Sequence, residues 1–125
     1  MSTIRLLTAA SGKAGEQTLP LDELAAELEG VQSGWLDILQ PGDAEKEFLL
    51  ETMGFHPLAV EDCFADPVDR AEHYEDHRFV VLRARDADSE LGTEYLLAFL
   101  TGSLLGTVRH TALPAMNRFR ERYRS

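Results

Sequence analysis

Apolar and polar positions change their spacing twice within the first third of the chain. Residues 4–9 alternate between two faces, which predicts a β-strand, and a second short strand follows after a turn. Apolar residues then recur at helical spacing over residues 21–28. Pro20 suits the first turn of this helix and Gly30 suits its end, so the pattern predicts a helix bounded on both sides.

A strongly apolar segment, residues 35–40 (WLDILQ), predicts a strand that is buried on at least one face. The dipeptide Pro41-Gly42 predicts a turn, and Asp43 is the expected N-cap of the helix that follows. Gly54 is the expected end of that helix. The apolar stripe of the helix consists of Phe48, Leu49, Thr52 and Met53.

A shorter helix is predicted to begin at Pro57 and to run to residue 64. In this helix we expect Leu58 and either Val60 or Phe64 to face the core, which directs the acidic side chains of the helix to the surface. The following residues, 65–76, are polar and acidic, and no strand is predicted within them.

The last third of the chain predicts three strands and a helix. Residues 79–85 form a strand, and residues 94–100 and 104–109 form a hairpin joined around Gly102. A final helix is predicted to begin at Pro114. Because the hairpin is antiparallel, the sheet cannot be wholly parallel, so we predict one α/β domain over residues 1–125, with a mixed sheet shielded by helices.

Charge is distributed unevenly along the 125 residues, whose formal net charge is −10. Residues 1–108 carry 21 acidic and seven basic side chains, a net −14, whereas residues 109–125 carry five arginines and one acid, a net +4. The acidic body argues against general nucleic-acid binding and against adhesion to anionic lipid, because both need a basic surface. The arginine-rich end is either the basic end of a helix or a segment that continues in a longer protein.

Several classes of site and signal are missing from the sequence. The single cysteine, Cys63, excludes an internal disulfide and a multi-cysteine zinc site. There is no signal peptide and no apolar run of the roughly 20 residues that a membrane-spanning helix needs, so we expect this chain itself to be soluble. Phosphate-binding glycine loops and a nucleophile elbow are also absent, and we expect no enzymatic activity.

Two clusters of side chains could hold a metal ion. On a helix, His73 and His77 would share a face and could bind zinc together with Glu72 or Asp76. On an extended backbone the same residues are a solvated approach to the next strand, and we favour this interpretation because the spacing alone is a weak signal.

The second cluster is the adjacent pair of Glu61 and Asp62 near the end of the short helix. Mg²⁺ prefers oxygen ligands, keeps several waters and often uses only one or two carboxylates, so the pair could bind it. Acidic residues are also common at the surface end of a helix. From the residues alone, a surface helix end is the better interpretation.

Five blocks in the same order resemble those of CorA-like divalent-cation transporters. The block GFHPLAVED carries the most specific resemblance, because it is similar to the family's F-G-[IL]-H-P-L-x-[IVL]-E-D segment. A departure follows it, since Asp69-Arg70 stands where the family usually has Pro-Lys. The five blocks are residues 35–42 (WLDILQPG), 54–62 (GFHPLAVED), 70–79 (RAEHYEDHRF), 79–84 (FVVLRA) and 99–109 (FLTGSLLGTVR).

The resemblance covers about residues 34–124 and implies the N-terminal cytosolic domain of such a transporter, an α/β/α sandwich. In the family, a stalk helix and two membrane helices follow this domain, the transporters are pentameric, and the domain lies at the cytoplasmic face of the cell membrane. The stalk and membrane helices are expected to be absent here, so membrane association would come only through those missing helices. We therefore expect the isolated chain to be a monomer.

The resemblance also implies a role for the acid pair. In the family, regulatory divalent-cation sites between neighbouring subunits use the last acid of the H-P-L-x-x-E-D block, with the preceding Glu contributing, which points to Asp62 and Glu61. The implied function is weak binding of Mg²⁺ or another divalent cation at subunit interfaces to control gating. Two alternatives stay open: a stand-alone partner-binding module of the same fold, and a small metal-dependent hydrolase that uses His73 and His77.

Overall fold

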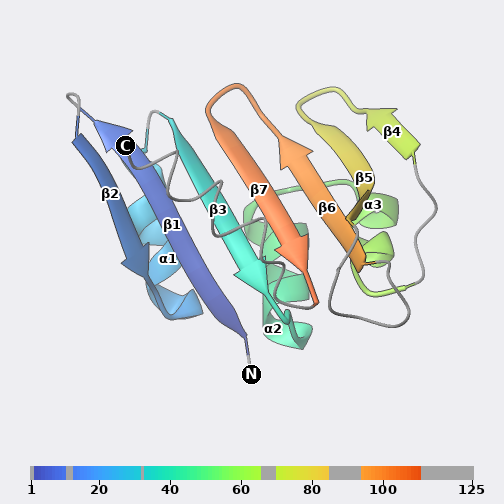
Figure 1. The fold of residues 1–125 in the computed structure, drawn as a ribbon, viewed down its shortest axis with the longest axis horizontal. Helices are drawn as coiled ribbons and strands as arrows, with labels where there is room; N and C mark the ends of the chain where they lie inside the picture. The colour runs from blue at the N-terminus through green and yellow to red at the C-terminus, as the bar shows by residue number, and fades with distance from the viewer. Residues whose placement is uncertain (1, 11–12, 32, 66–69, 85–93, 111–125) are drawn as a thin grey trace.

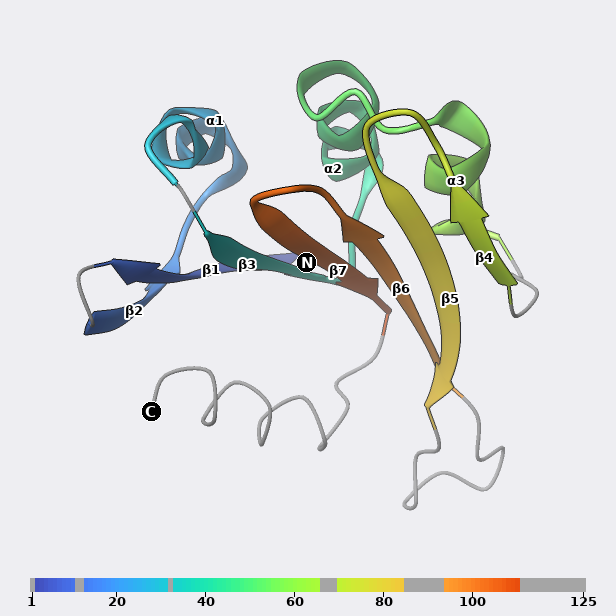
Figure 2. The ribbon, with the colours of Figure 1, turned by 90° about the horizontal axis from the view of Figure 1, so that it is seen from above.

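In the part of the chain that the structure describes, seven strands form one mixed sheet, and the α-helices lie on one of its faces (Figures 1 and 2). The computed structural model describes residues 2–10, 13–31, 33–65, 70–84 and 94–110. The strands are β1 (Thr3–Ala10), β2 (Lys13–Thr18), β3 (Gly34–Leu39), β4 (Arg70–His73), β5 (Arg78–Ala84), β6 (Glu94–Leu100) and β7 (Leu104–Arg109). The helices are α1 (Leu21–Glu29), α2 (Asp43–Glu47), the π-helical turn η1 (Phe48–Thr52) and α3 (Pro57–Asp62).

The strand order is β2-β1-β3-β7-β6-β5-β4. Strands β3 and β7 pair in parallel, whereas every other neighbouring pair in this sheet is antiparallel. The predicted α/β class with a mixed sheet is confirmed. The helix predicted from Pro114 lies outside the described residues.

The main core lies between the sheet and the helices. Alternate side chains of the central strands point toward the helices, so that Leu36 and Ile38 of β3 are each 1% exposed. Helix α1 contributes Leu24, which is fully buried. Burial of each such side chain contributes about 1.5–3 kcal/mol, and this hydrophobic burial holds the helical layer on the sheet.

The opposite face of β3 and β7 buries a polar network instead. Trp35 Nε1 donates a hydrogen bond to Thr107 Oγ1 at 2.8 Å, and Thr107 Oγ1 donates to Asp37 Oδ1 at 2.8 Å. Arg109 donates to both oxygens of Asp37, from Nε at 3.2 Å and from Nη2 at 2.8 Å. None of the four side chains is more than 5% exposed, so a bidentate ion pair is enclosed in the middle of the sheet.

Most predicted elements are confirmed, but four local expectations are wrong. Strand β4 forms where no strand was predicted, because pairing with β5 stabilises a polar segment that has little strand propensity of its own. The N-cap of α2 is Gly42 rather than Asp43, and its N–H donates to the carboxylate of Glu45 at 2.8 Å. Thr52 is exposed rather than part of the buried stripe, and Leu58 is 60% exposed.

The helix after β3 contains an extra residue. The Met53 N–H donates to the Phe48 carbonyl at 3.0 Å, a bond that spans five residues and defines the π-helical turn η1. Gly54 has φ of 69° and ends the helix as predicted, because this left-handed conformation is unfavourable for other residues. The extra residue changes which side chains face the sheet, and this change explains the exposure of Thr52.

The single cysteine lies in the main core. Cys63 follows the last residue of α3, is fully buried, and lies 3.6 Å from the Ala59 carbonyl. Burial raises the pKa of the Cys63 thiol well above its usual range, and the neighbouring charge of Asp62 raises it further. The thiol is therefore protonated and unreactive in the folded domain.

We expect the buried ion pair to be costly to break from one side only. Replacement Asp37→Leu leaves Arg109 buried without its partner and should lower the free energy of unfolding by about 3–5 kcal/mol. The double replacement Asp37→Leu with Arg109→Met should recover most of this loss, because no charge is left buried. Urea unfolding followed by fluorescence measures both effects, since Trp35 is the only tryptophan.

A control for this prediction is the ion pair between Arg5 and Glu16, whose charged atoms are 3.9 Å apart and whose side chains are 29% and 19% exposed. Replacement Glu16→Gln should cost less than about 1 kcal/mol. If Asp37→Leu proves no more destabilising than Glu16→Gln, the buried network does not hold the sheet together.

We also expect the stability of the domain to depend on Cys63 at alkaline pH. The pKa of Cys63 is raised in the folded state, so ionisation of the unfolded thiol lowers stability once the pH exceeds about 8.5. The loss should approach about 1.4 kcal/mol per pH unit, and Cys63→Ala should remove this part of the slope. Urea unfolding between neutral and alkaline pH measures it, and parallel slopes for both proteins would contradict the prediction.

Candidate metal-binding site

Helix α3 positions the acid pair. His56 is its N-cap, and His56 Nδ1 accepts the Leu58 N–H at 3.2 Å, while Pro57 occupies the first helical turn. Ala59 and Val60 are fully buried against the core. Because these two residues face inward, Glu61 is exposed at the far end of the helix, as predicted.

The helix is held at both ends by imidazoles from other elements. At the start, the His56 N–H donates to His77 Nε2 at 3.3 Å, and the His56 ring stacks on Tyr74 at 4.4 Å between centroids. At the end, His110 Nε2 hydrogen-bonds to the carbonyl of Cys63. These contacts fix a helix of six residues that would not be stable by itself.

Asp62 is placed differently from Glu61. Its side chain is 21% exposed, and its Oδ2 pairs with Nη2 of Arg70 at the start of β4. Arg70 Nε also lies 3.4 Å from Glu72 Oε1. The acid pair therefore consists of one exposed carboxylate and one carboxylate that is already compensated by a guanidinium of the same domain.

Leu58 does not take the inward position that the sequence predicted. It is 60% exposed, whereas Val60 is buried as expected. The reason is the face that α3 turns inward, because the buried residues Ala59, Val60 and Cys63 recur at helical spacing and leave position 58 on the opposite side. Leu58 consequently lies on the same outer surface as Glu61.

The two carboxylates of the acid pair could supply some, but not all, of the ligands that a Mg²⁺ ion needs. Carboxylate oxygens are the ligands that Mg²⁺ prefers, and the ion keeps several waters when it binds to one or two carboxylates. Among the described residues, however, no group of three or more His, Cys, Asp or Glu side chains could hold a metal ion. Glu61 and Asp62 would thus be two ligands of an ion whose remaining ligands come from water or from another chain.

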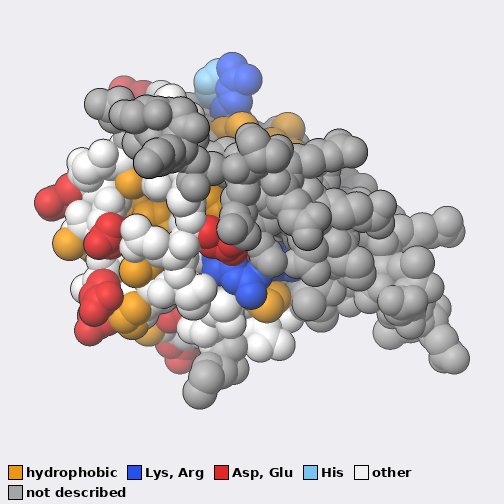
Figure 3. All heavy atoms as spheres, turned by 60° about the vertical axis from the view of Figure 1, so that its left-hand side comes forward, with side chains coloured by type: hydrophobic (Ala, Val, Ile, Leu, Met, Phe, Trp, Pro, Cys, Tyr) orange, Lys and Arg blue, Asp and Glu red, His pale blue; other side chains and the backbone are white. Residues whose placement is uncertain are grey.

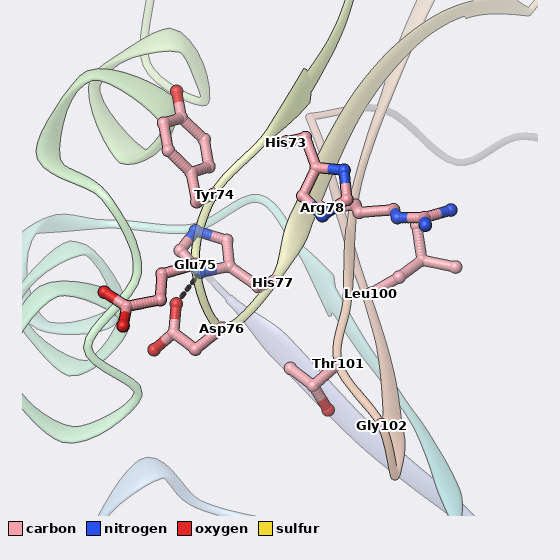
Figure 4. Close-up of a pocket in the computed structure, with 9 residues that line it drawn as sticks. All are labelled: His73, Tyr74, Glu75, Asp76, His77, Arg78, Leu100, Thr101 and Gly102. Carbon is pink, nitrogen blue, oxygen red and sulfur yellow. Dashed lines mark hydrogen bonds and ion pairs between the residues drawn. The ribbon is translucent and has the colours of Figure 1, made fainter.

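The histidines that could have bound zinc are arranged otherwise. His73 is exposed at the end of β4, while His77 is 5% exposed beyond a tight turn, and Figure 4 shows the two rings on different sides of the β4–β5 hairpin. His77 Nδ1 lies 2.5 Å from Asp76 Oδ1, and this hydrogen bond lowers the pKa of the Asp76 carboxyl. Since His77 Nε2 accepts the His56 N–H, both ring nitrogens of His77 are engaged within the domain.

A cavity of about 380 Å³ lies beside this hairpin, lined by residues 73–78 and 100–102 (Figure 4). Acidic Glu75 and Asp76 and basic Arg78 are all exposed at its edges. Their charges have opposite signs, so they define no single class of ligand.

Two further residues of the site were not identified from the sequence. Arg70 compensates Asp62 from β4, the next element along the chain. His110 binds the end of α3 from a position just after β7. The only signal for Arg70 was a basic residue shortly after an acid pair in an otherwise acidic segment.

No helix among the described residues is long and apolar enough to cross a lipid bilayer.

Known sequences identify the family. A profile described as "CorA-like Mg2+ transporter protein" matches residues 31–125. A Bacillus subtilis protein, YfjQ, whose name assigns it provisionally to metal ion transport, is 34% identical over 89 residues. That similarity covers 70% of this chain and 28% of YfjQ, so the chain spans less than a third of this relative.

Solved structures share the fold at lower identity. The cytoplasmic domain of ZntB from Vibrio parahaemolyticus superimposes with a TM-score of 0.72 at 12% identity, covering 97% of this chain and 49% of that domain. The CorA magnesium transporter from Methanocaldococcus jannaschii gives a TM-score of 0.68 at 19% identity, over 94% of this chain and 35% of the transporter. Because the profile match covers three quarters of this chain, the chain belongs to the CorA-like Mg²⁺ transporter family.

Proposed function

We propose that this domain is the cytosolic regulatory domain of a divalent-cation transporter, and that it senses Mg²⁺ at the interfaces between subunits. At each interface, Glu61 and Asp62 are the carboxylates that one of the two subunits contributes. The observation that carries the proposal is the position of Glu61 and Asp62 at the outer end of α3, in a chain of this family. In a full-length parent, five copies would form a ring at the cytoplasmic face of the membrane.

The charge of the domain supports a role for cations in assembly. Residues 1–108 carry a net −14, and Figure 3 shows acidic side chains gathered along the side of the molecule that α1 forms. Helix α1 has no basic residue, and its exposed acids are Asp22, Glu23, Glu27 and Glu29. Copies of such a body repel one another when packed together, and a divalent ion between facing carboxylates reduces that repulsion.

Such a cation can act as a signal only if it favours one arrangement of the subunits. An ion held between two copies binds the closed arrangement better than the separated one, so it shifts the population toward closure. Loss of the ion at low Mg²⁺ then allows the subunits to separate. Binding must be weak, near cellular Mg²⁺ concentrations, for occupancy to change when the concentration changes.

We expect the isolated chain to be a monomer at micromolar concentration without added metal, because like charges oppose its association. Millimolar Mg²⁺ should cause weak, reversible association that Glu61→Gln reduces. Replacement Glu51→Gln removes the same charge from another exposed position and should leave the association unchanged. Sedimentation velocity with and without Mg²⁺ measures all three proteins.

Two results would contradict the proposed function. One is a stable pentamer in the absence of metal, which would show that cations are not needed for assembly. The other is Mg²⁺-dependent association that Glu61→Gln and Glu51→Gln weaken equally, because the effect would then come from general charge screening.

A further inference from the structure

The carboxylate of Asp62 already has a cation beside it, and that cation belongs to the same chain. Arg70 Nη2 pairs with Asp62 Oδ2, and the two side chains are only 32% and 21% exposed. Asp62 Oδ2 and Arg70 Nε are both shielded from solvent and lack a hydrogen bond of ordinary geometry. The ion pair therefore compensates the Oδ2 oxygen of Asp62, which is shielded from water.

Strand β4 holds Arg70 in this position. Arg70 and Glu72 alternate with Ala71 and so lie on one face of the strand, and Arg70 Nε is 3.4 Å from Glu72 Oε1. The guanidinium carbon lies 5.8 Å from the centre of the Phe79 ring, which is fully buried. Since β4 pairs with β5 in fixed register, Arg70 faces α3 before any metal ion arrives.

A guanidinium and a hydrated divalent ion compete for the same carboxylate. Arginine stays charged at every physiological pH, so proton loss cannot remove it from Asp62. A divalent ion that uses both Glu61 and Asp62 must displace Arg70 or bind beside it against charge repulsion. The apparent affinity of the acid pair is consequently reduced by the fraction of time for which Asp62 is paired.

We propose that Arg70 is an internal competitor of the divalent cation at Asp62 and sets the cation concentration at which the acid pair is occupied. The inference rests on the proposed function, because it concerns the same two carboxylates. Glu61 is the first ligand that an incoming cation meets, and release of Arg70 from Asp62 completes binding. Strand β4 is short and lies at the edge of the sheet, so this release requires only a local movement.

The test is a titration of the 125-residue chain with Mg²⁺, followed by the backbone amide signals of Glu61 and Asp62 in NMR spectra. Replacement Arg70→Gln should tighten Mg²⁺ binding by about fivefold, the upper range for a partly exposed ion pair. Replacement Arg78→Gln is the matched control, because it removes an equal charge from an exposed position on β5. Arg78→Gln should leave binding at the wild-type level.

A second measurement needs no substitution. In the wild-type chain, the Nε–H signal of Arg70 should shift with the same Mg²⁺ dependence as the Asp62 amide, because the cation and the guanidinium exchange at one carboxylate. Replacement Arg70→Lys should give intermediate affinity, since it keeps the charge and loses the planar fork. Asp62→Asn combined with Arg70→Gln should remove the gain in affinity.

The possible outcomes separate this inference from the proposed function. Equal Mg²⁺ affinity for Arg70→Gln and Arg78→Gln overturns the inference, as does an Arg70 signal that Mg²⁺ leaves unmoved, and neither result affects the association experiment. Binding by Arg70→Gln without any wild-type binding supports the inference while contradicting the proposed sensing by this chain. An absence of binding in every variant overturns the inference, because a site that only Arg70 blocks should bind Mg²⁺ in Arg70→Gln.

Discussion

The parallel pairing of β3 with β7 is the contact on which the rest of the sheet depends. It joins two antiparallel groups of strands, β2-β1-β3 and β7-β6-β5-β4, which have no other hydrogen-bonded connection in the described sheet. Asp37 and Arg109 are 72 residues apart in the sequence, and their bidentate pair secures the junction on the face away from the helices. Because Asp37 pairs in register with Thr107, a shift by one residue would separate every partner of the network. Because a buried ion pair contributes little net stability, we interpret this one as a contact that specifies the register of β3 and β7.

The same junction determines where the acid pair lies. The chain leaves β3, forms α2, η1 and α3 on one face, and returns through β4, β5 and β6 before β7 closes the sheet. Helix α3 is tied to this return at three points, through His77 before β5, Arg70 on β4 and His110 after β7. A displacement of α3 would therefore also change the contact with His110, just after β7.

Local sequence patterns predicted the strands and helices whose signals are local. Alternation predicted β1 and β3, and the glycines at positions 30 and 54 marked two helix ends. Strand β4 was missed because its only support is the neighbouring β5, and Leu58 was placed wrongly because the packing of Ala59 and Val60 decides which face of α3 points inward. The acid pair was identified from its residues and favoured as a metal site only through a resemblance, whereas its partner Arg70 was not identified, because the ion pair forms only when β4 folds against α3. An ion pair between two elements leaves no periodic trace in a sequence, even when the elements follow one another along the chain.

The π-helical turn η1 has a consequence for how this fold changes over evolutionary time. A π-turn is a turn of α-helix with one additional residue, and its longer hydrogen-bonded ring accommodates that residue locally. Loss of one residue between Phe48 and Thr52 would restore regular α-helical bonding without shifting the register of any strand. The stretch from β3 to α3 can therefore lengthen or shorten by one residue while the acid pair keeps its place. Gains and losses of single residues among related chains should gather in this stretch rather than in the strands that flank it.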